Sequence, residues 1–99
     1  MPSKGLRGER DSGVPVGFQA LTVSNVAVGL TVPKGVTFGF IEVQDNPIRV
    51  FFHGDAPTAA VGHLYIPGQS DVWNENEMRH ALAIATGSDA TLAVTYYYS

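Results

Sequence analysis

The chain has 99 residues, of which 44% are hydrophobic and 15% are charged, and its formal net charge is −3. This length supports one small domain with a single core, and the negative charge disfavours duplex nucleic acid, which binds clustered Lys and Arg. The sequence contains no cysteine, so disulfides and thiolate metal sites are excluded.

The first 17 residues are expected to form a flexible arm. The stretch MPSKGLRGERDSGVPVG is rich in Gly, Pro, Ser and mixed charge and has no apolar period, a composition typical of flexible termini. It also lacks the apolar centre of a signal peptide, and the apolar run ALAIA at 81–85 is too short to span a bilayer. We therefore expect synthesis in the cytoplasm and no membrane partner.

Short apolar and β-branched stretches follow one another from residue 18 to the C-terminus. Pro, Gly, Asn and Asp separate them about every eight to twelve residues, which is the spacing of a β-sandwich or barrel. The strands are expected at residues 18–23, 26–32, 36–44, 48–53, 62–66, 81–86 and 91–98.

Two of these strands carry apolar residues on both faces. In VTFGFIEVQ, Phe38 and Phe40 point to one side and Ile41 and Val43 to the other. In TLAVTYYYS, the three consecutive tyrosines are divided between the two sides in the same way. One face of each strand can bury itself in the core, and the other needs a second apolar surface, either a packed sheet or a neighbouring chain.

The stretch SDVWNENEMRHALAIAT fits two patterns. Asn74 followed by Glu77 resembles a capping box, and Met78, Ala81 and Leu82 recur at helical spacing. The residues after His80 also alternate as in a strand. We favour a short helical turn over residues 75–79 that leads into a strand, with a continuous helix as the alternative.

These elements predict an all-β fold. The expected architecture is a single-domain, antiparallel β-sandwich of seven or eight strands, jelly-roll-like, over residues 18–99, preceded by the flexible arm at 1–17 and including one short helical turn.

The loop FFHGDAPTAAVGH raises the question of a metal site. His53, His63 and His80, together with Asp55, offer metal-ligand chemistry. Their spacing matches no local ligand motif, so we interpret His53 and His63 as strand-end residues beside a loop and His80 as solvent-facing. Gly54 is suited to a positive φ, and we interpret this segment as a wide structural loop between two strands.

No other pattern indicates catalysis. A Gly-x-Ser-x-Gly elbow is absent, and Ser70 lies in the predicted turn GQSD. Most carboxylates fall in turns, where Asp is expected for backbone reasons. Glu42 alone lies within a strand, and we expect it near the strand end at the rim of the sheet. The sequence therefore predicts a non-enzymatic protein without a cofactor, a catalytic residue or a bound metal.

The segments PIRVFFHGDAPTAAVGHLYIPGQ and DATLAVTYYYS resemble small proteins encoded among the head-assembly genes of tailed bacteriophages. The resemblance covers about residues 36–99 and includes the Ile-Arg strand, the Gly-Asp-Ala-Pro-Thr loop and the terminal Ala-Thr-Leu-x-Val-Thr-Tyr-Tyr. The chain departs from the family pattern at Phe51, Phe52 and His53, where charged residues are frequent. The best-described members are capsid decoration or cement proteins.

The resemblance implies a structural virion protein that stabilises the outer surface of a phage head. Its partners would be the major capsid protein and further copies of itself. We expect a homotrimer, because capsid lattices offer threefold positions and the second aromatic face needs burial. Basic residues of the arm would anchor on an acidic capsid surface, and aromatic residues would supply the remaining contacts. The expected interface residues are Lys4, Arg7, Arg10, Phe51, Tyr65, Trp73, Tyr96, Tyr97 and Tyr98.

Three alternatives remain open at this point. A carbohydrate- or receptor-binding β-domain would stack Trp73 and the tyrosines on sugar rings. A head–tail connector or tail component would use the same surfaces for other virion contacts. A cupin-like metalloenzyme would require the three histidines to converge on one metal ion.

Overall fold

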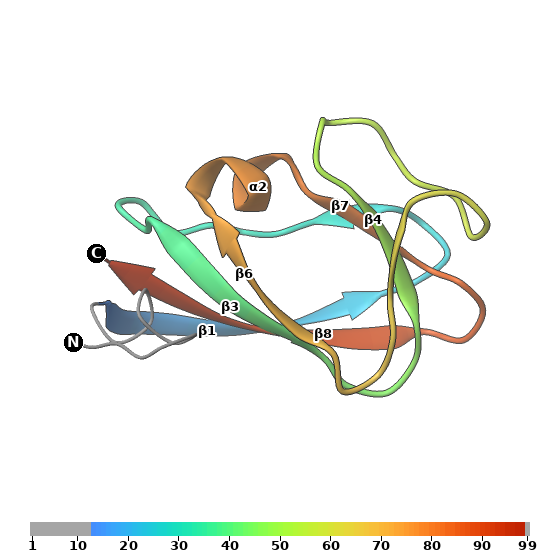
Figure 1. The fold of residues 1–99 in the computed structure, drawn as a ribbon, viewed down its shortest axis with the longest axis horizontal. Coiled ribbons are helices and arrows are strands. Elements are labelled where there is room, and N and C mark those ends of the chain that lie inside the picture. The colour runs from blue at the N-terminus through green and yellow to red at the C-terminus, as the bar shows by residue number, and fades with distance from the viewer. Residues whose placement is uncertain (1–12, 99) are drawn as a thin grey trace.

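A computed structural model describes residues 13–98 as eight strands and one short helix (Figure 1). Residues 1–12 and 99 lie outside the described part, and with them most of the expected arm, including Lys4, Arg7 and Arg10. The elements are β1 (Val14–Val23), β2 (Val28–Gly29), β3 (Phe38–Val43), β4 (Ile48–Phe51), β5 (His63–Tyr65), β6 (Ser70–Asn74), α2 (Glu75–His80), β7 (Leu82–Ala85) and β8 (Ala90–Tyr98).

The strands form two four-stranded antiparallel sheets. The first sheet has the order β1-β8-β3-β6 and the second sheet has the order β2-β7-β4-β5. The chain changes sheet at every connection except the one between β4 and β5, which gives the eight-stranded, double Greek-key arrangement of a jelly roll. The predicted all-β sandwich is therefore confirmed, at the upper of the two expected strand numbers.

Strands β1, β2 and β6 differ most from the prediction. Strand β1 begins at Val14, so residues 14–17 belong to the sheet and not to the arm. A register shift between Pro15 and Gly17 accommodates the proline, which lacks a backbone donor. Strand β6 was not predicted, because the polar sequence SDVWN has no run of β-branched residues. Strand β2 contains two residues of the seven expected at 26–32.

The core lies between the two sheets and follows the period-2 pattern. On β8, Leu92, Val94 and Tyr96 face the core, whereas the alternate residues face outward. Trp73 on β6 is 1% exposed and is the largest of the fully buried side chains. The other fully buried side chains are Tyr96, Ile41, Ile48, Met78, Leu92, Val23, Val36, Val43, Val50 and Val94.

Helix α2 begins at the predicted capping box. The Asn74 side chain accepts a hydrogen bond from the Glu77 backbone N–H at 2.8 Å, and the Glu77 carboxylate accepts one from the Asn74 N–H at 2.8 Å. The helix ends at His80 and the chain continues as strand β7, so the short helical turn is confirmed and the continuous helix is not formed. Met78 packs so closely over Gly39 that a Cβ there would approach its sulfur to 2.6 Å.

One carboxylate joins the sheets at the edge where β5 and β6 lie. The Asp71 Oδ2 atom accepts hydrogen bonds from the Tyr65 hydroxyl at 2.8 Å and from the Trp73 indole N–H at 3.1 Å. Tyr65 belongs to the second sheet and the other two residues to the first. The indole N–H also contacts the Tyr65 hydroxyl at 3.2 Å. The buried polar atoms of both aromatic side chains are thereby satisfied.

Replacement of this carboxylate should destabilise the fold. We expect Asp71→Ala to lower the free energy of unfolding by about 2 kcal/mol, because the Tyr65 and Trp73 donors lose a charged acceptor. Urea denaturation followed by tryptophan fluorescence measures the change. The matched control is Asp89→Ala in the exposed β7–β8 loop, which should change the midpoint little; equal effects of the two substitutions would contradict this role for Asp71.

Candidate functional site

The loop between β4 and β5 is held in place by Arg49. The Arg49 guanidinium donates hydrogen bonds to the carbonyl oxygens of Ala59 at 3.2 Å and Gly62 at 2.9 Å. A turn closed by Thr58 and Val61 shapes the middle of the loop, and Gly54 has φ of 88° as the sequence predicted. Arg49 and this turn together therefore define the conformation of the loop.

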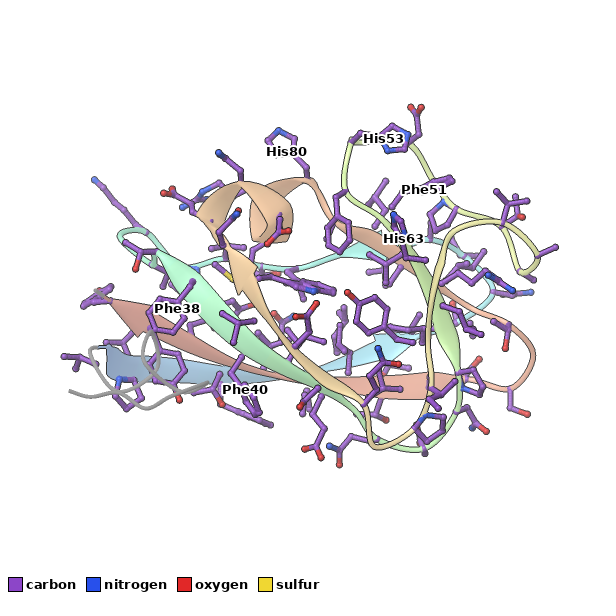
Figure 2. All side chains as sticks on the ribbon, in the orientation of Figure 1. Phe38, Phe40, Phe51, His53, His63 and His80 are labelled. Atoms are coloured by element: carbon purple, nitrogen blue, oxygen red, sulfur yellow. The ribbon has the colours of Figure 1, made fainter. Side chains whose placement is uncertain are left out.

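The three histidines do not converge on one point. The Nε2 atom of His53 lies 3.3 Å from the Asp55 carboxylate, and both side chains are exposed. His63 stands beside the Phe52 ring at 5.9 Å, and His80 contacts the Asn76 carbonyl within α2. Figure 2 shows His80 on the helix, away from the loop that carries His53. Across residues 13–98, no group of three His, Asp or Glu side chains could hold a metal ion.

Glu42 and Ser70, the two other candidates for a catalytic residue, lie at the surface. Glu42 points outward from β3 and accepts a hydrogen bond from the Gln44 side-chain amide at 3.1 Å. It is the penultimate residue of β3, so the expected position near the strand end at the rim of the sheet is confirmed. Ser70 is exposed at the start of β6. Glu42 and Ser70 face each other in the strand register, which leaves them as solvated neighbours at one end of the sheet.

The outer face of the first sheet is nearly uncharged and carries a group of apolar side chains. Strand register places successive side chains in rows across β1, β8, β3 and β6, and the central row is Phe18, Thr95, Phe40 and Val72. The Phe18 side chain is 66% exposed. Among the paired outward positions of these strands, Glu42 is the one charged residue. A face of this kind is typical of a surface that contacts another protein.

An aromatic stack lies in the next row of the same face. The rings of Phe38 and Tyr97 are parallel within 4° and their centroids are 4.8 Å apart. Gly13, just before β1, lies against both rings, since a Cβ there would come within 2.5 Å of Phe38. Phe38 and Phe40 project from the same side of β3 (Figure 2). The stack therefore forms one end of the apolar face.

The outer face of the second sheet is apolar to a smaller extent. Leu64 on β5 is exposed, and Ile84 on β7 is half-buried. Arg49 stands between them in the register, and its guanidinium is engaged by the loop. This face is interrupted by a charged side chain at its centre, so the first sheet presents the more continuous apolar surface.

Four of the predicted interface residues are buried by packing within the chain. Tyr65, Trp73, Tyr96 and Tyr97 are all buried within the single chain, so we correct their assignment as surface anchors. Trp73 in particular is not available to stack on a sugar ring. Tyr97 faces outward, but its ring is covered by packing on that face, including the stack with its neighbour on β3.

The remaining predicted aromatic residues reach the surface in part. Phe51 is half-buried and lies 4.8 Å from the His53 ring, and Tyr98 is exposed at the end of β8, where it packs near Gly35. Phe18, the most exposed aromatic residue named here, was missed as an interface residue. Continuing the period-2 count from Phe18 through Thr22 would have placed it on the outer face.

Two buried tyrosines have raised pKa values. Burial raises the pKa of Tyr65 to about 12, and the hydrogen bond to Asp71 acts in the same direction, against the opposing effect of Trp73. Burial raises the pKa of Tyr96 to about 12, and its hydroxyl donates to Gln19 Oε1 at 2.6 Å. Both groups are structural hydroxyls and stay neutral over the physiological pH range.

Comparison of the chain with protein-family models, with curated proteins and with solved structures finds no match. Within residues 13–98, no helix is long and apolar enough to cross a membrane.

The raised tyrosine pKa values predict loss of stability at high pH. A neutral hydroxyl that is favoured in the folded state stabilises the fold fully below pH 10, the ordinary pKa, and this contribution is lost as the pH rises toward 12. Phenolate absorbance and circular dichroism, recorded together against pH, should show late ionisation coinciding with unfolding. Tyr65→Phe should weaken this dependence, because it removes one of the two buried phenols; an unchanged dependence in that variant, or ionisation of Tyr65 and Tyr96 near pH 10 in folded protein, would contradict the prediction.

Proposed function

We propose that the chain is a structural virion protein that decorates the head of a tailed bacteriophage and stabilises it by protein–protein contacts. The resemblance of residues 36–99 to head-assembly proteins suggests the class. The jelly-roll sandwich is compatible with it, because such folds recur in viral coat components, although a fold alone does not determine function. The observation that carries the proposal is the apolar outer face of the first sheet.

The outer face has the chemistry of a docking surface. Phe18 and Val72 lie at opposite edges of one cross-strand row, with an aromatic residue of β3 between them. Complete burial of an exposed phenylalanine contributes about 1.5–3 kcal/mol, and the near absence of charge on this face avoids the cost of desolvating ions. The partner would be the major capsid protein, with the chain located on the capsid surface after synthesis in the host cytoplasm.

The basic arm stays a prediction, and the homotrimer is an expectation from the resemblance that this proposal does not include. Lys4, Arg7 and Arg10 lie outside the described residues, and the structure describes a single chain. A head–tail or tail component would use the same apolar face, and attachment to isolated heads distinguishes it from decoration. The proposal invokes no catalysis, no nucleic acid and no cofactor.

Charge placed on the apolar face should prevent attachment. We expect Val72→Glu to weaken co-sedimentation with assembled phage heads at least tenfold, because a carboxylate in the contact would be buried without a partner. The heads are those of the phage that encodes the chain, prepared without this protein. Phe18→Ser should weaken attachment in the same direction by removing the exposed ring.

The control is Leu64→Glu on the outer face of the second sheet, which introduces the same charge on the opposite side of the sandwich. Attachment should be retained by this variant. Equal loss in both glutamate variants, or full attachment of Val72→Glu, would overturn the assignment of the docking face. Binding of the isolated wild-type protein to a glycan array, without attachment to heads, would favour the carbohydrate-binding alternative.

A further inference from the structure

Strand β1 is an edge strand, and no described strand pairs with its outer side. We propose that two copies of this chain associate through β1, antiparallel to each other about a twofold axis near Ala20, so that the two first sheets become one continuous eight-stranded sheet. The inference stands apart from the proposed virion function, since it concerns the edge of the sheet and a second copy, whereas capsid attachment concerns the outer face.

The direction of the β1 backbone groups follows from hydrogen bonds elsewhere in the first sheet. The Gln44 N–H donates to the Thr91 carbonyl at 2.9 Å. This bond shows which residues of β8 direct their backbone N–H and C=O groups toward β3, namely Thr91 and every second residue after it. The intervening residues, such as Val94, point toward β1. Since Gln19 is paired with Val94, the Gln19 backbone groups are used within the sheet.

The residues on either side of Gln19 therefore point away from β8. The N–H and C=O groups of Phe18, Ala20 and Thr22 face the free edge, and no described strand lies beside it. Their side chains all lie on the outer face of the sheet. Three residues in alternation thus present both donors and acceptors to a partner strand.

The other three sheet edges are protected. Strand β2 has two residues and β5 has three, and very short edge strands offer little to a partner. Strand β6 carries Asp71 and continues directly into α2. Strand β1 has ten residues and no charged side chain. Pro15 and the register shift beside it interrupt the start of β1, so the open template extends from Phe18 to Thr22.

The side chains of this segment suit pairing with a second copy. With the axis at Ala20, the Ala20 residues of the two copies form a hydrogen-bonded pair at the centre, which is the more widely spaced type of pair in antiparallel strands. Phe18 of each copy then stands opposite Thr22 of the second copy, an aromatic and β-branched pair of the kind that stabilises antiparallel strands. Because the segment is uncharged, twofold symmetry places no like charges together.

The mass of the full-length chain in solution tests the proposal. Sedimentation equilibrium should give twice the monomer mass of 10.6 kDa, because an isologous strand contact closes after two copies. Ala20→Pro should abolish the dimer: it deletes the central edge N–H while the bonds between β1 and β8 stay intact, since proline is tolerated where the N–H faces outward. Ala20→Val keeps the N–H and should remain dimeric.

Hydrogen exchange provides a second test that needs no variant. The amides of Phe18 and Ala20 should become protected as the wild-type concentration rises, whereas the Gln19 amide should be protected at every concentration. A monomer up to about 1 mM, a mass of three copies, an intact dimer in folded Ala20→Pro or loss of the dimer in Ala20→Val would each overturn the proposal. Capsid attachment plays no part in these readouts, so they are independent of the proposed function.

Discussion

The Asp71 carboxylate is the interaction on which the packing of this small sandwich depends. Trp73 is the largest of the fully buried side chains, and its indole N–H can be buried only because an acceptor lies at 3.1 Å. The indole then packs edge-on against Phe52 of the loop and Tyr65 of the second sheet. One acidic residue on an edge strand therefore orients the centre of the core, joins the two sheets and supports the loop.

The two edge strands of the first sheet carry different polar side chains that hydrogen-bond to buried aromatic residues. On β6 this side chain is the Asp71 carboxylate, and its charge also disfavours pairing of this edge with another strand. On β1 the corresponding side chain is neutral: Gln19 accepts hydrogen bonds from the Tyr96 hydroxyl and the Thr31 backbone N–H. Because Gln19 points inward, its side chain does not use the outward backbone groups of its neighbours, and no described strand pairs with them. The asymmetry of the sheet follows from where its polar side chains point.

Sequence patterns predicted the architecture better than the surface. Alternation and turn residues located seven strand regions, and the capping box located the helix, because these signals are local. The period-2 count also showed correctly that β8 has two apolar faces. It did not show that Tyr97 would be covered by packing on the outer face, where it stacks on Phe38, because that depends on strand register. Aromatic residues were therefore assigned to an interface when most of them pack within the chain.

Edge pairing and face docking reinforce each other in the proposed assembly. Phe18 and Ala20 direct their backbone groups to the sheet edge and their side chains to the outer face, so pairing of two copies at the edge brings their apolar faces into one surface. A dimer can then contact a lattice of identical capsid subunits at two points, and the second contact forms at the high effective concentration set by the first. A weak contact by a small domain is sufficient under these conditions. In the proposed assembly, the same short strand links self-association to the strength of capsid binding.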